Sequence, residues 1–149
     1  MATIDELTKT KFTDDRHRLV TNIMYTSNWI KNLFTELLKP YGLSVQQFNI
    51  LRILRGAKDW VAMNDVKRLM IEKAPNATRL SDKLLEKKLI ERKRSEQDRR
   101  MVYLRISDAG LAVLEQLDLI KEGEHIDFIG RITEEEAKAL NLVIDKLRG

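Results

Sequence analysis

The stretch IERKRSEQDRRMVYLRI, residues 90–106, decides the fold of this 149-residue chain. Residues 90–94 and residues 102–106 both alternate in polarity, as strands with one buried face do. Asp98, Arg99 and Arg100 lie between them, at the expected tip of a two-stranded hairpin. Because a basic helical segment directly precedes this hairpin, the order of elements predicts a winged helix whose tip arginines enter a DNA groove.

The composition favours one compact domain. The chain has 43% hydrophobic residues and shows no internal repeat or low-complexity linker. No apolar run approaches the roughly 18 residues of a membrane span, and the first residues lack the order of a secretion signal, so we expect a cytoplasmic protein without a membrane partner. The absence of cysteine excludes disulfides and thiolate metal sites. His17 and His125 stand far apart and read as surface residues, so we expect no metal and no cofactor.

Charge is segregated along the chain, although the net charge is only +4. Residues 67–100 hold twelve basic and six acidic side chains, whereas residues 107–149 hold five basic and ten acidic ones. The basic segment is typical of a surface that binds a polyanion. A solvated helix face has the same charge pattern, so the charge count by itself leaves both interpretations open.

The segment before the basic region is helical by its hydrophobic periodicity. Residues 14–39 carry the apolar stripe of one long amphipathic helix, which ends before Gly42. Ser44 and Gln47 form a capping box for a second helix, and we expect Gly56 to end it.

A short third helix is predicted at residues 64–71. Asn64 is its expected cap, and Leu69 is expected to face inward with its apolar neighbours. After the hairpin, Ser107 begins another helix that we extend towards Phe128. A second capping box, formed by Thr133 and Glu136, begins the last amphipathic helix.

The basic helix is predicted at residues 75–88, with Pro75 in its first turn. Three apolar residues fall within about 60° of one another on its wheel: Ala77, Leu80 and Leu84. A separate arc carries Asn76, Arg79 and Lys83. Asn pairs with adenine edges, and Arg or Lys with guanine edges, in the major groove, so this arc predicts base-reading side chains. Ordinary solvated helix residues would give the same pattern.

Six blocks of sequence, in their order and spacing, resemble the multiple-antibiotic-resistance regulator (MarR) family of transcription factors. They are YGLSVQQF at 41–48, ATRL at 77–80, LIER at 89–92, DRR at 98–100, SDAG at 107–110 and ITEEE at 132–136. The resemblance covers nearly the whole chain. It implies a mainly α fold with a small β-hairpin wing, in which a winged-helix lobe at about 44–106 binds DNA. Helices at about 1–39 and 107–149 would form a homodimer.

The resemblance also implies roles for single residues. The arginine that enters the minor groove falls on Arg100, and the acid that shapes the wing falls on Asp98, where a carboxylate can accept hydrogen bonds from a guanidinium two residues away. Arg99 would meet phosphate. The chain departs from the family at Lys73-Ala74-Pro75-Asn76, where relatives often carry hydroxyl residues that hold phosphate. The residues expected to contact DNA are Lys73, Asn76, Thr78, Arg79, Lys83, Arg94, Asp98, Arg99 and Arg100.

Many members of that family respond to a small aromatic or phenolic ligand held between the dimerisation helices and the DNA-binding lobe. Here the expected lining of such a pocket is Tyr25, Trp29 and Phe48, although aromatic residues at helical spacing also form cores and dimer interfaces. Apolar helices at both ends of the chain exceed what a small winged lobe can cover. The residues expected in the dimer interface are Leu19, Ile23, Leu117, Leu140, Ile144 and Leu147.

The resemblance, together with these features, implies a ligand-responsive repressor that binds a pseudo-palindromic DNA operator as a homodimer. A winged-helix module that binds an acidic protein would carry the same basic face and is the alternative; sequence-selective, salt-sensitive DNA binding would exclude it. We expect no enzyme, because the sequence has no nucleophile with a base, phosphate-cradling glycine loop or metal-ligand cluster at a recognisable spacing.

Overall fold

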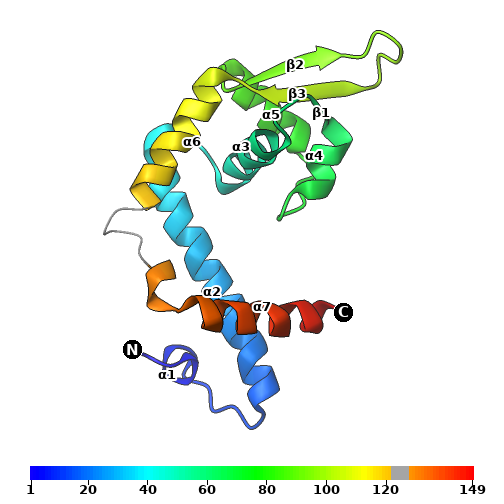
Figure 1. The fold of residues 1–149 in the computed structure, drawn as a ribbon. Coiled ribbons are helices and arrows are strands. Elements are labelled where there is room, and N and C mark those ends of the chain that lie inside the picture. Colours follow the sequence, from blue (N-terminus) through cyan, green and yellow to red (C-terminus); the bar gives the residue numbers. More distant parts are fainter. Residues whose placement is uncertain (122–127) are drawn as a thin grey trace.

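The computed structural model describes residues 1–121 and 128–149, so His125 and the predicted extension of the post-hairpin helix lie outside the described residues. It is mainly helical with one small sheet, as the sequence predicts (Figure 1). The elements, in chain order, are α1 (Ile4–Thr8), α2 (Asp15–Leu38), η1 (Lys39–Tyr41), α3 (Val45–Ala57), β1 (Val61–Ala62), α4 (Met63–Leu69), α5 (Ala77–Glu86), β2 (Ile90–Arg94), β3 (Val102–Ile106), α6 (Asp108–Lys121), η2 (Ile129–Arg131) and α7 (Glu134–Arg148).

The long helix α2 connects two groups of elements. One of its ends meets the winged lobe, formed by α3, α4, α5 and the sheet, and its other half contacts α1 (Figure 1). Asp14 caps the start of α2 by accepting a hydrogen bond from the Arg16 amide. Hydrogen bonds from the Arg16 side chain and amide hold the pKa of the Asp14 carboxyl below its usual value. This cap confirms that the long helix begins where the sequence places it.

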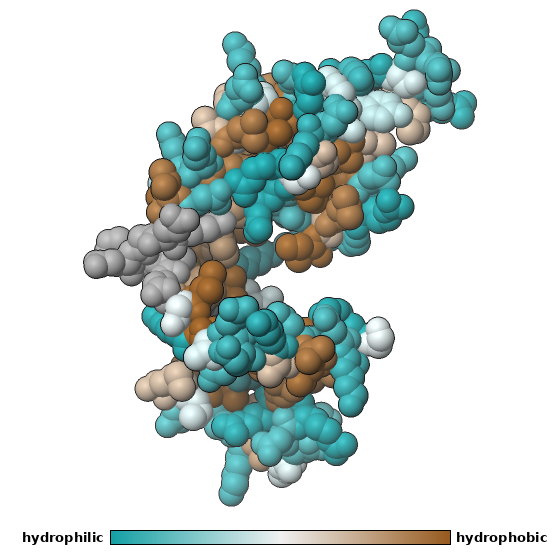
Figure 2. All heavy atoms as spheres, in the orientation of Figure 1, coloured by the Kyte–Doolittle hydropathy of each residue, from teal (hydrophilic) through white to brown (hydrophobic). Residues whose placement is uncertain are grey.

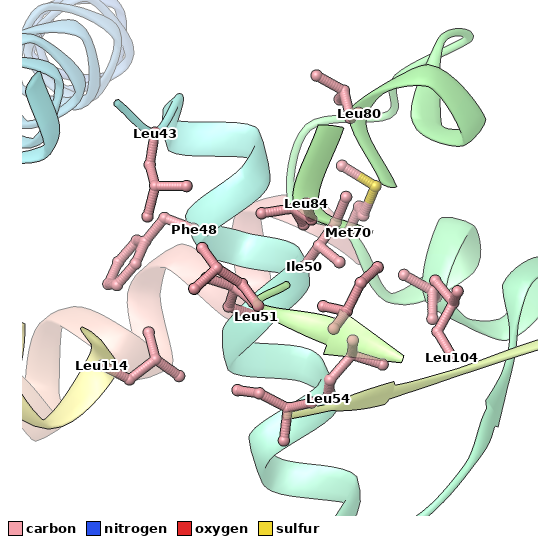
Figure 3. Packing of buried hydrophobic residues seen from close by; sticks show 14 of the residues in the cluster. Leu43, Phe48, Ile50, Leu51, Leu54, Met70, Leu80, Leu84, Leu104 and Leu114 are labelled. Atoms are coloured by element: carbon pink, nitrogen blue, oxygen red, sulfur yellow. The ribbon is translucent and has the colours of Figure 1, made fainter. Parts of the chain in front are cut away.

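Helix α3 lies at the centre of the winged lobe, and Figure 3 shows its apolar side chains meeting those of the surrounding elements. Ile50, Leu51 and Leu54 are fully buried, and Leu114 of α6 packs in the same core. Leu117 is also fully buried in this core. It offers no surface to a second subunit, which corrects its assignment to the dimer interface. An apolar stripe in a sequence does not show whether the same protomer or a second one covers it. Here the winged lobe of the same protomer covers Leu114 and Leu117 of α6.

The sheet has the strand order β1-β3-β2, and both pairings are antiparallel. Strand β1, which the sequence analysis did not predict, pairs Val61 with Leu104 and Ala62 with Tyr103. This pairing holds Ala62 extended, so α4 begins at Met63 without a side-chain cap. Asn64 therefore lies inside the helix, which corrects its assignment as the cap.

Other boundaries also differ from the predicted ones. The Leu69 side chain, at the end of α4, is 57% exposed, although it was expected to face the core. Helix α3 continues through Gly56 to Ala57, and Lys58, which caps it, adopts the left-handed conformation. Helix α5 begins at Ala77, so Pro75 lies in the turn before it. Helix α1 was missed, although Thr3 and Glu6 form its capping box.

The start of α6 is tied to the end of α5. The Ser107 hydroxyl donates to the Lys88 carbonyl at 2.7 Å and accepts from the Gly110 amide at 3.1 Å. A side chain at Gly110 would place its Cβ 2.2 Å from the Leu89 carbonyl oxygen, which is closer than real Cβ contacts come. The glycine therefore allows the close approach that brings both ends of the hairpin to one place.

Helix α7 presents an apolar face that its own protomer does not cover. None of its described side chains is buried, and Leu140 and Leu147 are 46% and 56% exposed. Figure 2 shows apolar patches among hydrophilic surface over this lower part of the molecule and hydrophilic surface over the hairpin tip. Within residues 1–121 and 128–149, no helix combines the length and the apolar character needed to cross a membrane.

Candidate nucleic-acid interface

Helix α5 separates its buried and exposed faces as the sequence predicts. Ala77, Leu80 and Leu84 are buried against the core. On the same side, the buried Ser81 hydroxyl donates to the Ala77 carbonyl at 2.9 Å. The opposite face carries the exposed side chains of Asn76, Thr78, Arg79 and Lys83. Burial of one face thus directs four of the predicted DNA-contacting residues to solvent.

The hairpin tip is a hydrogen-bonded turn. The Met101 amide donates to the Asp98 carbonyl at 2.9 Å, and the Ser95 amide donates to the Met101 carbonyl at 2.9 Å. The Asp98 carboxylate accepts from the Arg100 amide at 3.0 Å. The sequence analysis expected this carboxylate to hold the Arg100 guanidinium, and the structure corrects that expectation. An acceptor two residues before an amide closes an Asx turn, so Asp98 shapes the backbone that carries Arg100.

A basic hollow of about 230 Å³ lies between α4, α5 and the hairpin. Its lining includes Lys67, Thr78, Arg92, Arg94 and Arg100. Two of the arginines have partners in the protomer: Arg92 bonds Asp82 at 2.5 Å, and Arg94 donates to the Arg99 carbonyl at 3.5 Å. The structure thus brings three predicted residues together, Thr78, Arg94 and Arg100.

Lys67 and Arg92 belong to the same hollow but were not among the predicted DNA-contacting residues. Both lie in the basic segment, yet one-dimensional charge does not say which cations converge. Strand alternation could have predicted the position of Arg92, because residues two apart on a strand share a face. Arg92 and Arg94 stand in that relation on β2 and both line the hollow.

Lys73 has a structural partner. Its ammonium donates to the Arg68 carbonyl and, at 3.5 Å, to the Lys67 carbonyl. These carbonyls are among those left unpaired at the C-terminal end of α4, where a cation is also favoured by the helix dipole. Lys73 therefore caps α4, and its expected contact with DNA stays a prediction.

The three aromatic residues predicted to share a ligand pocket line two different hollows. Tyr25 and Trp29 line a hollow of about 800 Å³ between α1 and α2. Phe48 lines another, of about 460 Å³, between α2 and the winged lobe. There its ring stacks on Phe34 with a centroid distance of 5.9 Å. The single predicted pocket is corrected, because Tyr25 and Trp29 lie on one face of α2 whereas Ile30 and Phe34, on another face, line the hollow with Phe48.

The remaining predicted dimer residues all keep exposed surface within the protomer. Leu19 and Ile23 are half-buried on α2, and Ile144 is half-buried on α7. Leu140 and Leu147 are exposed. The described residues contain no group of three or more His, Asp or Glu side chains that could hold a metal ion.

The segment that forms the winged lobe matches a known protein family. The model of the transcriptional regulator family SarA/Rot matches residues 32–117, which include α3, α5 and the entire hairpin. The chain belongs to the SarA/Rot family of transcriptional regulators. Such regulators are not enzymes.

Two curated relatives support the same assignment. The uncharacterised helix-turn-helix regulator YpoP of Bacillus subtilis is 35% identical over 91 residues, which cover 60% of this chain and 62% of YpoP. The match thus spans less than two thirds of that relative. The multiple antibiotic resistance protein MarR of Escherichia coli is 26% identical over 116 residues, covering 77% of this chain and 80% of MarR. The resemblance to the MarR family is confirmed.

Solved structures share the fold of this SarA/Rot member. A MarR-like regulator from Bacillus cereus superposes with a TM-score of 0.77 at 18% identity, covering 90% of this chain and 96% of that one. A mutant of Escherichia coli MarR complexed with operator DNA gives 0.72 at 22%, covering 92% and 99%. The organohalide-sensing regulator RdhR, bound to 2,4-dichlorophenol, gives 0.76 at 22%, covering 91% and 80%.

The Asx turn at the hairpin tip leads to a prediction about Asp98. Asp98→Ala and Asp98→Asn remove the same negative charge, so both should raise non-specific DNA affinity equally. Only the asparagine can still accept the Arg100 amide hydrogen bond. We expect Asp98→Ala to lower the preference for a selected operator over unrelated DNA by roughly three- to tenfold, and Asp98→Asn by less than about twofold.

Fluorescence anisotropy at matched salt measures both affinities. If both variants lost the preference for the operator over unrelated DNA to the same extent, Asp98 would not act through the Asx turn.

Proposed function

We propose that this regulator binds a pseudo-palindromic operator in the cytoplasm as a homodimer and represses transcription there. The observation that carries the proposal is the shared position of two recognition elements. The exposed face of α5 and the hairpin tip with Arg100 border one basic hollow, to which α5 contributes Thr78. A protein seated on promoter DNA through both elements would block access of polymerase to that DNA.

The two elements suit the two grooves of B-DNA. The major groove admits an α-helix, and arginine or lysine pairs there with guanine, as Arg79 and Lys83 of α5 would. A narrow minor groove has an enhanced negative potential that attracts arginine, as it would Arg100 at the tip. The basic hollow between the elements would then face the phosphates that separate the grooves, where Lys67 and Arg94 supply sequence-independent affinity.

We predict that Arg79→Ala weakens binding to the selected operator by about 1–3 kcal/mol and relaxes the preferred sequence at one position. Alanine cannot make the bidentate base contact that we propose for the exposed guanidinium. Selection of binding sites from random duplexes, followed by anisotropy, measures both effects. Lys138→Ala on α7 removes the same charge away from the interface and serves as the control.

An unchanged consensus with Arg79→Ala would show that another face of α5 reads the bases. If the unmodified protein itself had no preference among DNA sequences, the basic surface would instead suit an acidic protein partner, and the proposed function would fail.

The homodimer is supported by apolar surface that the protomer leaves open. Leu19 and Ile23 on α2 keep part of their surface, and the large apolar side chains of α7 remain accessible. Exposed apolar side chains of this kind are common at interaction sites in proteins. A two-fold arrangement lets the same patch cover itself on a second copy and spaces two α5 helices for the two halves of a palindrome.

The dimer predicts the effect of charge on α7. Leu140→Asp combined with Ile144→Asp should give a monomer, because each carboxylate would be buried without a partner at a cost of several kcal/mol. Light scattering should change from about 35 kDa, twice the chain mass of 17.4 kDa, to the chain mass itself. Asn141→Asp on the same helix is the matched control and should leave the dimer intact. A double variant that remained dimeric would place the interface elsewhere.

We further propose that a small aromatic or phenolic effector binds the hollow lined by Phe34 and Phe48. Lys31 of α2 forms an ion pair at 2.9 Å with Glu72, in the segment between α4 and α5. The Ile71 amide in that segment donates to the Asn49 side chain at 2.9 Å. All of these residues line the hollow. An effector there would press on the segment that leads into α5 and so alter its position on DNA.

The effector site predicts a difference between two exposed residues of that region. Ile71 lines the hollow and Leu69 does not. Ile71→Asp should weaken binding of 2,4-dichlorophenol by about tenfold or more, because the apolar wall becomes charged, whereas Leu69→Asp should leave it unchanged. Calorimetric titration measures the binding, and anisotropy measures the loss of operator affinity when the phenol is present. Equal effects of the two substitutions would place the effector outside this hollow.

A further inference from the structure

An aromatic side chain links the first strand of the sheet to the hairpin, on the side away from the basic hollow. Trp60 directly precedes β1 and is half-buried. The ammonium nitrogen of Lys93, on β2, lies 4.4 Å from the centre of the Trp60 ring. The guanidinium carbon of Arg105, on β3, lies 4.6 Å from the same centre. Trp60 therefore receives one cation from each strand of the hairpin.

Cross-strand pairs complete this cluster. The register places Lys93 opposite Tyr103, whose ring centre is 6.0 Å from the Lys93 nitrogen. It also places Glu91 opposite Arg105, which donates to the Glu91 carboxylate at 3.0 and 2.6 Å. Because neighbouring strand residues point to opposite faces, Lys93 is directed away from the hollow that Arg92 and Arg94 line. The cations of this cluster have partners within the protomer.

The link matters because the core holds the hairpin mainly through the buried Ile90, Leu104 and Ile106, whereas residues 91–94 of β2 are exposed. Strand β1 has only two residues and pairs with β3, so it forms no backbone hydrogen bonds with β2. Two-stranded hairpins are marginal alone, and they twist readily. Trp60 reaches past β3 to Lys93, which precedes the last residue of β2 before the tip. A change of angle at this point would displace Arg100 further out.

We propose that Trp60 is a positioning residue for DNA recognition. Through Lys93 and Arg105 it sets the angle of the hairpin, and hence the point where Arg100 meets the minor groove. Trp60 acts through the wing, because cations already occupy its ring and it stands on the face opposite the basic hollow. The inference rests on the proposed function, since it assumes that the wing contacts DNA.

The test compares Trp60→Leu with Trp60→Phe on the selected operator carrying A·T-rich or G·C-rich flanks. Leucine keeps apolar bulk but removes the aromatic face, whereas phenylalanine keeps a face for the cations. We expect Trp60→Leu to weaken binding to the A·T-flanked operator by about three- to tenfold and to reduce the flank preference, with Trp60→Phe within about twofold of the unmodified protein. Thermal unfolding of each variant reports its stability separately.

Repeating both substitutions with Arg100→Ala separates positioning from a general effect. If Trp60 acts through Arg100, Trp60→Leu should cause no further loss in that background. An equal loss in both backgrounds, or no change in flank preference, would overturn the proposal. If Trp60→Leu does not fold, Lys93→Met and Lys93→Arg test the same contact from β2: the arginine variant should keep the flank preference and the methionine variant should lose it. Equal behaviour of those two would also overturn it.

The same measurements separate this inference from the proposed function. An unmodified protein that does not prefer the selected operator contradicts the proposed function itself. A protein that does prefer it, with additive losses from Trp60→Leu and Arg100→Ala, contradicts the role of Trp60 alone.

Discussion

Burial of one face of α5 against α3 is the constraint on which the rest of the structure depends. Ala77 and Leu84 are fully buried, and fully burying a side chain such as Leu84 stabilises a fold by about 1.5–3 kcal/mol. The rotation of α5 about its axis is thereby set, and so is the direction of Arg79 and Lys83. The hairpin follows within a few residues, and Ser107 and Gly110 return it to the end of α5. Core packing therefore determines what the molecule presents to a partner.

The electrostatic arrangement of the interface follows from this packing. Lys67, Arg92, Arg94 and Arg100 come from three separate segments and border one hollow, where like charges repel one another. The Asp82 carboxylate and the Arg99 carbonyl offset part of that repulsion. A polyanion would offset the remainder, which is a physical reason why this surface would attract DNA. The neighbouring cations Lys93 and Arg105 contact the Trp60 ring instead, so adjacent charges on the same hairpin have different partners.

Apolar packing of Phe34, Leu37 and Leu38 joins α2 to the core of the winged lobe, and two polar contacts reach the segment before α5. The Lys31–Glu72 ion pair and the Asn49–Ile71 hydrogen bond join α2 and α3 to the segment before α5. Exposed ion pairs contribute about 0–1 kcal/mol, so this connection is easily altered. A weak connection beside an apolar hollow suits the proposed response to an effector, whereas the packed core around Leu51 keeps the winged lobe intact.

The sequence by itself determined the features that depend on local rules. Capping boxes at Ser44 and Thr133 begin their helices as predicted, because the cap and its partner lie three residues apart. Alternation predicted β2 and β3 with their observed bounds, and the wheel of α5 predicted which face is buried. Only the tertiary structure decided features that need distant partners. Pairing of β1 with β3 moved the start of α4, and the covering of α6 by the winged lobe took Leu117 out of the dimer surface. The capping of α4 by Lys73 and the contacts of Trp60 with Lys93 and Arg105 have the same origin. An ammonium group or an aromatic ring interacts with the groups that the fold brings within a few ångströms of it. Which groups these are depends on the packing of the entire chain.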